Sequence, residues 1–146
     1  MAGLISVKDV MTKDIQKIKT DTTVQEAVAT MTKYDISSVI VTQKDKPVGI
    51  ITHKDLLIKV LQPRIPTANL TARGVMSPTV TTIKEDASLE EAAKLMTRKG
   101  LKKLVVIRDD KLVCIITSMD IIKEEPKLVN LLEGLLKSCT PNAEKP

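Results

Sequence analysis

The stretch Val48-Gly49-Ile50-Ile51-Thr52-His53-Lys54-Asp55 decides the fold, because its pattern returns 65 residues later as Val113-Cys114-Ile115-Ile116-Thr117-Ser118-Met119-Asp120. The same offset aligns residues 10–59 with 75–124 without a gap, and about a third of the aligned positions are identical. A repeat of fixed period indicates two copies of one supersecondary unit. Two such copies usually pack about a pseudo-two-fold axis, and a cleft between them is a common place for a small ligand.

Each copy has the pattern strand, helix, strand, strand, helix. The first copy predicts strands over 15–18, 39–41 and 48–52, a helix opening at Thr23 and a second helix over 55–61. The second copy predicts a helix opening at Ser88 and strands over 104–107 and 112–117. Near-continuous β-branched strands favour sheets covered on both faces. The expected fold class is α/β (α+β), with two β-α-β-β-α repeats whose small sheets pack through helices.

The first helix of each copy carries two further signals. Thr23 with Glu26, and Ser88 with Glu91, have the spacing of a capping box. Apolar residues then recur at helical spacing. The expected buried faces are Val24, Ala27, Val28 and Met31 in the first copy, and Leu89, Ala92, Ala93 and Met96 in the second.

The chain is divided into four parts on this pattern: 1–62 as the first repeat, 63–70 as a linker, 71–125 as the second repeat, and 126–146 as a C-terminal helix with a polar tail. Pro63 and Pro66 end the first repeat's last helix. An isolated helix as short as the one after Pro126 is marginal in water. Its leucines are therefore expected to pack on the module or on a partner subunit.

Composition narrows the function. The 146 residues are 42% hydrophobic, with no Phe or Trp and one Tyr, so the core is aliphatic and stacking of nucleic-acid bases is disfavoured. The net charge of +5 suits an anionic partner. Two cysteines and one histidine indicate neither a metal site nor a disulfide framework. No membrane span or signal peptide is evident, which predicts a cytoplasmic protein.

The motif Thr-x-x-Asp marks the candidate site in both copies. An apolar strand ends in a hydroxyl, Thr52 or Thr117, and an acid follows three residues later, Asp55 or Asp120. Helix N-termini favour phosphate, and a carboxylate can accept two bonds from a ribose diol. The same spacing is also that of a plain capping box. The motif alone leaves both interpretations open.

Three stretches belong to the pattern of the first copy: Val10-Met11-Thr12, Asp21-Thr22-Thr23-Val24-Gln25-Glu26-Ala27 and the run from Val48 to Asp55. Together they resemble the cystathionine-β-synthase (CBS) domain. The second copy matches through Val75-Met76-Ser77-Pro78 and through Asp120. Two such domains in tandem, here over about 5–125, resemble a stand-alone Bateman module.

This resemblance implies an adenine nucleotide (AMP, ADP or ATP) as ligand, bound in clefts between the repeats, with no cofactor. It places Asp55 on the ribose, Thr52 and Lys54 near the phosphate, and the base against backbone near the start of the second repeat. The first implied site comprises Ile50, Thr52, Lys54, Asp55, Ser77, Thr79, Thr81, Leu101 and Lys102. The mirror site comprises Ile115, Thr117, Met119, Asp120, Thr12, Asp14, Gln16, Ser37 and Ser38.

The chain departs from the family pattern in ways that make the two sites unequal. The proline usual within the second strand is replaced by Ile40 and Val105, and Gly49 has Cys114 as its counterpart. A side chain at Cys114 is expected to crowd its cleft. Lys54 is a cation where Met119 is apolar. The Asp55 site is therefore expected to be the better phosphate site.

The sequence favours a regulatory, energy-sensing module over an enzyme, because it has no nucleophile with a base beside it and no Gly-rich phosphate loop. Two alternatives stay open: an interaction module that has lost its ligand, and a basic nucleic-acid-binding protein. A homodimer is expected, because apolar helix residues exceed one core's needs. They are Leu56, Leu57, Val60, Leu61, Ile121 and Ile122. An effector protein is also implied.

Overall fold

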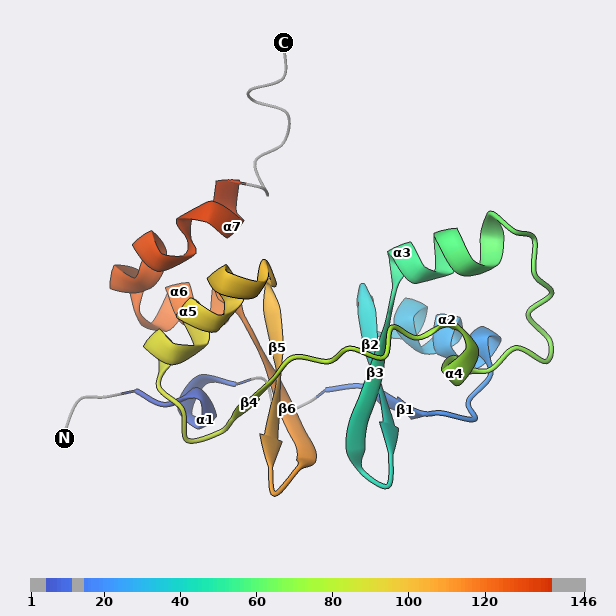
Figure 1. Cartoon of the computed structure of the whole chain (residues 1–146), viewed down its shortest axis with the longest axis horizontal. Helices are drawn as coiled ribbons and strands as arrows, with labels where there is room; N and C mark the ends of the chain where they lie inside the picture. The colour runs from blue at the N-terminus through green and yellow to red at the C-terminus, as the bar shows by residue number, and fades with distance from the viewer. Residues whose placement is uncertain (1–4, 12–14, 138–146) are drawn as a thin grey trace, which may run out of the picture. The chain divides into compact units, whose positions relative to one another are not determined.

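The computed structural model describes residues 5–11 and 15–137, and it has the predicted α+β fold of two repeats (Figure 1). The first repeat contains β1 (Lys17–Lys19), α2 (Val24–Lys33), β2 (Ser38–Gln43), β3 (Lys46–Thr52), α3 (His53–Leu56) and a π-helical turn, η1 (Leu57–Leu61). The second contains β4 (Thr82–Lys84), α5 (Leu89–Lys99), β5 (Lys103–Arg108), β6 (Lys111–Thr117) and α6 (Ser118–Glu124). The remaining elements are α1 (Val7–Val10), α4 (Ala72–Val75), the 3-10 helix η2 (Pro126–Leu132) and α7 (Glu133–Lys137).

Each repeat forms a three-stranded sheet, with the orders β1-β2-β3 and β4-β5-β6. The β1 strand is parallel to β2, with Ile18 opposite Val41, and β4 is parallel to β5, with Ile83 opposite Val106. These partners are related by the offset of 65 residues, so the repeat in sequence is also a repeat in strand register. The β2 and β3 strands are antiparallel.

The chain forms two compact units that are composed differently from the sequence repeats. One unit contains 14–81 with 109–112, and the other contains 1–13, 82–108 and 113–146. The helix α1, which precedes the first repeat, therefore belongs to the unit of the second repeat. The helix α4, which precedes the second repeat, belongs to the unit of the first.

Backbone hydrogen bonds hold these two exchanged segments. Ala72 N–H donates to the Thr22 carbonyl at 2.7 Å, and Arg73 N–H donates to the Thr20 carbonyl at 3.1 Å. In the other unit, Val7 N–H donates to the Ala87 carbonyl at 2.8 Å, at positions that correspond under the same offset. Both units are thus built in the same way. The short helix that precedes one repeat is hydrogen-bonded to the other repeat.

The core of each unit is aliphatic, as the composition predicts. In the unit that contains the first repeat, Val24, Ala27 and Met31 from α2 pack with β-strand residues such as Val41 and Ile51. The expected face of α5 is buried in full by Leu89, Ala92, Ala93 and Met96. The expected face of α2 was wrong at one position, because Val28 is 40% exposed. Val28 lies at the edge of the buried stripe formed by Val24, Ala27 and Met31.

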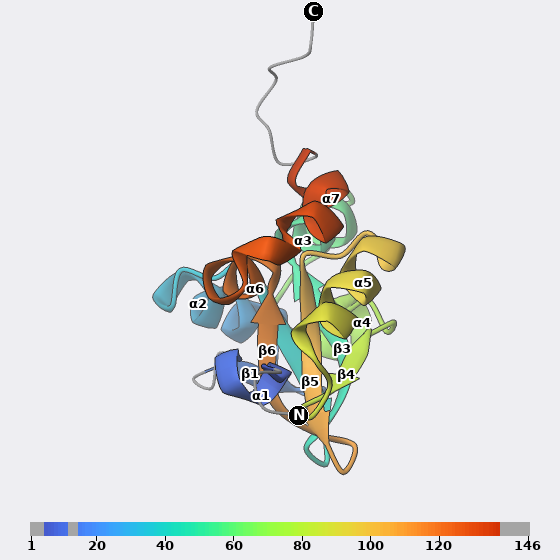
Figure 2. The ribbon, with the colours of Figure 1, turned by 90° about the vertical axis from the view of Figure 1, so that its left-hand side faces the viewer.

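The tail after Pro126 packs on the second repeat's unit. Leu132 and Leu135 are buried in its core, and Leu128 and Leu131 are partly buried against it. The Thr97 hydroxyl donates to the Leu131 carbonyl, which ties α5 to η2. Figure 2 shows this unit from the side, with α7 at its C-terminal end. The expected single helix is instead a 3-10 segment followed by the short α7. Packing on the module is confirmed.

The part of the chain that the structure describes contains no helix long and apolar enough to cross a membrane.

The ends of the two long helices provide a matched test of backbone strain. The α5 helix ends at Gly100, which has φ +68°, and a Cβ added there would contact nothing within 4 Å. The corresponding residue after α2 is Asp35, with φ +51°. Glycine has no steric penalty in this left-handed region, whereas a residue with a Cβ does.

We predict that Gly100→Ala lowers the free energy of unfolding by about 1 kcal/mol through backbone strain alone. Asp35→Gly is expected to change it in the opposite direction, by a smaller amount because aspartate tolerates this conformation. Urea denaturation of both variants measures the two effects. A neutral Gly100→Ala would show that the end of α5 relaxes to another conformation.

Candidate functional site

The candidate site is built where β3 ends and α3 begins. Thr52 is the N-cap of α3, and its hydroxyl accepts a bond from the Asp55 amide at 3.1 Å. The Asp55 carboxylate returns the interaction, because its Oδ2 accepts from the Thr52 amide at 2.9 Å and from the Thr52 hydroxyl at 3.0 Å. The capping interpretation of the motif is therefore correct in this structure. It does not account for the other carboxylate oxygen.

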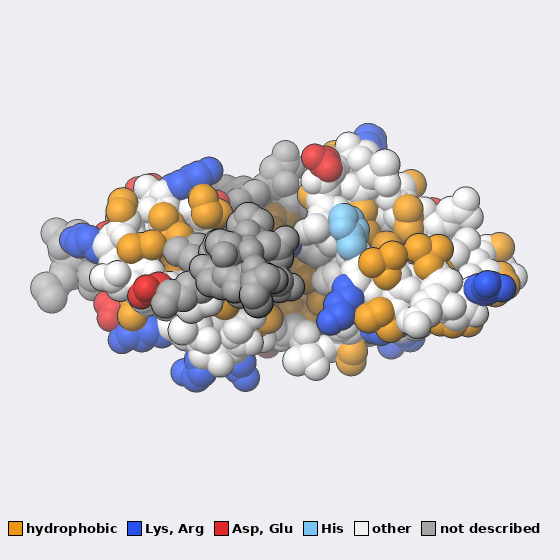
Figure 3. All heavy atoms as spheres, turned by 90° about the horizontal axis from the view of Figure 1, so that it is seen from above, with side chains coloured by type: hydrophobic (Ala, Val, Ile, Leu, Met, Phe, Trp, Pro, Cys, Tyr) orange, Lys and Arg blue, Asp and Glu red, His pale blue; other side chains and the backbone are white. Residues whose placement is uncertain are grey.

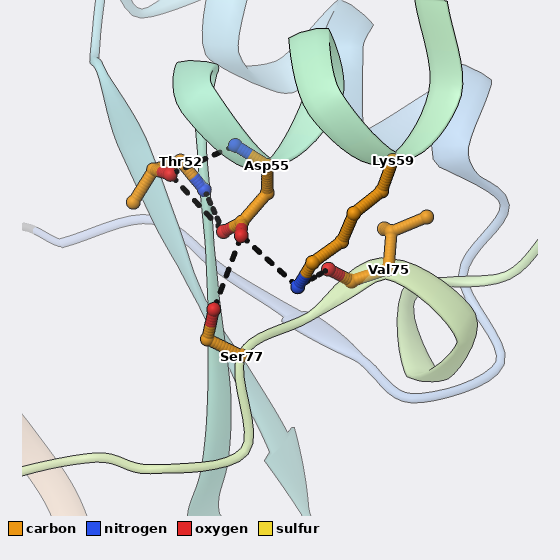
Figure 4. A network of polar contacts seen from close by, with 5 residues as sticks. All are labelled: Thr52, Asp55, Lys59, Val75 and Ser77. Atoms are coloured by element: carbon orange, nitrogen blue, oxygen red, sulfur yellow. Dashed lines mark hydrogen bonds and ion pairs between the residues drawn. The ribbon is translucent and has the colours of Figure 1, made fainter. Parts of the chain in front are cut away.

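The second oxygen of Asp55 has partners from elsewhere in the same unit (Figure 4). Its Oδ1 accepts from the Ser77 hydroxyl at 3.1 Å and lies 3.1 Å from Lys59 Nζ. Lys59 Nζ also donates to the Val75 carbonyl at 2.9 Å. Asp55 is only 8% exposed, which makes it one of three buried polar residues in the described chain. A helix cap alone requires neither the contacts to Oδ1 nor this degree of burial.

Ser77 reaches Asp55 because the segment after α4 pairs with the edge of β3. Ser77 N–H donates to the Ile50 carbonyl at 2.8 Å, and Ile50 N–H donates to the Ser77 carbonyl at 3.0 Å. Both backbone groups of Ser77 are thus used in strand pairing, which leaves its hydroxyl for Asp55. Gly49 permits the close approach, since a Cβ there would lie 2.8 Å from Cγ of Met76.

The electrostatics keep Asp55 ionised. Burial raises the pKa of its carboxyl, but the bonds from the Thr52 amide, Lys59, the Thr52 hydroxyl and Ser77 outweigh burial and hold the pKa below its usual value. A carboxylate with this environment is a strong hydrogen-bond acceptor at neutral pH. It is suited to the hydroxyl donors of a sugar.

The other residues of the first predicted site are divided between the two units. Lys54 is exposed at the start of α3, Thr79 is exposed, and Thr81 is half-buried, all in the same unit as Asp55. Leu101 and Lys102 belong to the other unit. The contacts described here therefore bring together Ile50, Thr52, Asp55 and Ser77.

The second copy has a simpler arrangement. Thr117 caps α6, its amide donates to Asp120 Oδ2 at 2.9 Å, and its hydroxyl accepts from the Asp120 amide at 3.1 Å. Met119 is exposed and Ile115 is half-buried in the same unit. The remaining predicted residues Gln16, Ser37 and Ser38 belong to the other unit. Thr12 and Asp14 lie outside the described residues.

The sequence analysis did not assign Lys59 or Val75 to the candidate site. The spacing of Asp55 and Lys59, four residues apart on a helix, could have indicated an ion pair. The Val75 carbonyl could not have been found, because it depends on the placement of α4. Cys114 is buried, and it lines a hollow of about 580 Å³ together with Met11, Lys8 and Arg108. Among the described residues, no three His, Cys, Asp or Glu side chains are grouped to hold a metal ion.

A comparison with known families identifies the repeats. The model of the CBS domain matches twice, over residues 7–62 and 72–127. The chain is a tandem pair of CBS domains. This confirms the resemblance drawn from the motifs, and the two matches correspond to the two copies of the repeat.

Relatives with similar sequences differ in length. An uncharacterised protein of Methanopyrus kandleri is 39% identical over 135 residues, which are 91% of this chain and 69% of that protein. The inosine-5'-monophosphate dehydrogenase of Methanocaldococcus jannaschii is 37% identical over 117 residues, which are 79% of this chain and 22% of the dehydrogenase. This CBS pair is thus similar both to much of a short protein and to a small part of an enzyme.

Solved structures of CBS pairs are similar along most of the chain. The CBS domain pair of protein MJ0100, in complex with 5'-methylthioadenosine and S-adenosyl-L-methionine, has a TM-score of 0.71 and 26% identity, and the match covers 85% of this chain and 98% of that one. CBSX2, in complex with AMP, has a TM-score of 0.71 and 25% identity over 84% of this chain and 97% of that one. Both of those proteins bind an adenosyl compound.

The bonds to Asp55 predict an acid-sensitive contribution to stability. The folded pKa of Asp55 is lower than its unfolded value near 4, so the contribution is present above that pH and is lost as the pH falls through the folded pKa. Asp55→Asn is expected to lower the free energy of unfolding at pH 7 by about 1–3 kcal/mol and to flatten its decrease below pH 4. Urea denaturation across pH 2–7 measures both effects.

Asp120→Asn is the matched control for this measurement. It removes the charge from the same capping position. Among the described residues, however, only Thr117 donates a hydrogen bond to the Asp120 carboxylate. Its effect on stability is expected to be smaller. Equal effects at the two positions would show that Ser77 and Lys59 contribute nothing to the stability provided by Asp55.

Proposed function

We propose that this CBS pair is a regulatory module that binds an adenine nucleotide or a related adenosyl compound at Asp55 and has no catalytic activity. The observation that carries the proposal is the convergence of Thr52, Ser77 and Lys59 on the buried, ionised carboxylate of Asp55. Two similar CBS pairs that bind adenosyl compounds support the class of ligand. A module of this kind would report adenylate or adenosyl levels, and thus energy status, to an effector protein.

The chemical roles follow from the types of group. Asp55 accepts hydrogen bonds from the ribose diol, because an ionised carboxylate acts only as an acceptor and hydroxyls can donate to it. Lys54, an exposed cation one residue away, balances the phosphate charge, and Thr52 lies near the phosphate. The base lies near the backbone of Thr79 and Thr81. Leu101 and Lys102 complete this site in the proposal.

The two sites are proposed to be unequal. The second site would use Ile115, Thr117, Met119 and Asp120 with Thr12, Asp14, Gln16, Ser37 and Ser38. Met119 provides no charge where Lys54 provides one. A phosphorylated ligand is therefore expected to prefer the Asp55 site, whereas an uncharged adenosyl compound has less reason to discriminate.

Calorimetric titration with AMP, ADP, ATP, S-adenosylmethionine and adenosine tests the proposal. Asp55→Ala is expected to weaken binding about tenfold or more, because a hydrogen bond to a charged group contributes about 1.5–3 kcal/mol. Lys54→Ala is expected to weaken binding of AMP or ATP but to spare adenosine, because only the phosphate interaction is lost.

Asp120→Ala is the internal control, with a smaller expected effect on nucleotide binding. The absence of heat at millimolar concentrations of every ligand would contradict the proposal. It would favour the alternative of an interaction module without a ligand. A steep salt dependence of nucleic-acid binding, unaffected by Asp55→Ala, would favour the other alternative.

We also propose that the module forms a homodimer through an apolar patch on the unit that contains the first repeat. Leu57, Ile58, Leu61 and Ile65 are 42–65% exposed, and orange apolar side chains gather beside the pale-blue histidine in Figure 3. Two residues expected in this surface were wrongly assigned, because Val60 and Ile121 lie in the cores of their units. A patch of this kind suits a self-complementary two-fold interface.

Light scattering at tens of micromolar protein is expected to give the mass of a dimer. Leu61→Glu is expected to lower the mass to that of a monomer, because it would bury a charge at the interface. Val129→Glu is the control, since Val129 is an exposed apolar residue of the other unit. A monomeric wild-type protein would contradict this proposal and leave the ligand proposal unaffected.

A further inference from the structure

The Lys59 ammonium contacts both the Asp55 carboxylate and the Val75 carbonyl, and this pair of contacts is called the Lys59 clasp. The ammonium is 3.1 Å from Asp55 Oδ1 and 2.9 Å from the Val75 carbonyl oxygen (Figure 4). The Lys59 side chain is 38% exposed, whereas that of Asp55 is 11% exposed. Lys59 is therefore the more solvent-accessible partner of this ion pair.

The carboxylate is saturated in this arrangement. Oδ2 accepts two bonds from Thr52, and Oδ1 is contacted by the Ser77 hydroxyl and by the Lys59 ammonium. A carboxylate offers about four lone-pair sites, so a ligand hydroxyl can bond to Asp55 only by replacing a partner already present. The two bonds from Thr52 also hold the start of α3 and are the harder pair to remove.

Among the two partners of Oδ1, Lys59 is the easier one to displace. Ser77 is held by two backbone bonds to Ile50, so its hydroxyl can rotate but cannot leave. Lys59 has a flexible four-carbon stem that can carry its ammonium into solvent at little desolvation cost. Lys59 is the more exposed partner of the pair, so its charge is hydrated when it leaves and a ligand hydroxyl takes its place on Oδ1.

We propose that Lys59 sets the ligand affinity of the Asp55 site by occupying Asp55 Oδ1 in the free protein and leaving it when a ribose hydroxyl binds. This inference rests on the proposed function of Asp55 as the ribose acceptor. Release of Lys59 also breaks its bond to the Val75 carbonyl. Ligand binding therefore removes a tie between η1, which carries Leu57 and Leu61, and the segment of α4.

The second copy lacks this clasp. Glu124 occupies the position that corresponds to Lys59, four residues after Asp120. A glutamate cannot donate to a carboxylate when both are ionised, and like charges at this spacing repel. The proposal therefore assigns the competing cation to the Asp55 site alone.

The test uses Lys59→Met, which keeps most of the stem and removes the charge. Adenosine is the main probe, because it has no phosphate that Lys59 could attract. Calorimetry is expected to show adenosine binding about 2–10-fold tighter than in the wild type, since no ion pair is lost on binding. Without ligand, the variant is expected to melt at a lower temperature, and saturating adenosine is expected to reduce that difference.

Lys94→Met is the matched control. Lys94 pairs with Glu90 at 3.0 Å with the same four-residue spacing, on an exposed face of α5 in the other unit. This variant has the same change in net charge, and its adenosine affinity is expected to equal that of the wild type. Lys59→Gln is a second variant that repeats the measurement with a polar side chain.

The outcomes separate the two proposals. Tighter adenosine binding by Lys59→Met, or binding by the variant where the wild type shows none, supports the clasp. Wild-type binding with equal or weaker binding by both Lys59 variants overturns the clasp and leaves the proposed function standing. No adenosyl binding by the wild type or by either variant overturns both.

Discussion

The structure depends on the short helix that precedes each repeat and is hydrogen-bonded into the unit of the other repeat. Ala72 and Arg73 both bond to the loop between β1 and α2, and this fixes the course of the chain that follows. That course brings Ser77 to the edge of β3, where its backbone pairs with Ile50. Only then can a hydroxyl from outside the first repeat reach Asp55. The candidate site is a consequence of this exchange, since Thr52 and Asp55 alone form a helix cap.

The two copies share a cap but differ in what surrounds it. Both Asp55 and Asp120 occupy the third position of a capping box, with nearly the same bond lengths. The difference lies four residues later, where Lys59 in one copy corresponds to Glu124 in the other. One carboxylate is covered by a cation and the other has an acid beside it. The two copies therefore share the capping geometry of the site, whereas single side chains make the two sites electrostatically distinct.

Much of the fold could be predicted from the sequence, because the signals were local or repeated. The capping boxes, the hairpin strands and the buried stripe of α5 all follow from residue type and spacing. Errors arose where packing decides. Val28 fits the helical period but is exposed, whereas Val60 and Ile121, which were expected at a surface, are buried. For the site, the motif identified Thr52 and Asp55, but Lys59 and the Val75 carbonyl depend on how η1 and α4 pack. A periodicity argument contains no information on that packing.

The account centres on Asp55 as an acceptor whose partners change when a ligand binds. A crystal structure of the protein with bound adenosine or AMP tests this most directly. The account predicts a ribose hydroxyl within about 3 Å of Asp55 Oδ1, the two Thr52 bonds intact, and Lys59 Nζ moved away from Oδ1. A ligand bound elsewhere, with Thr52, Ser77 and Lys59 all still bonded to Asp55, would contradict it.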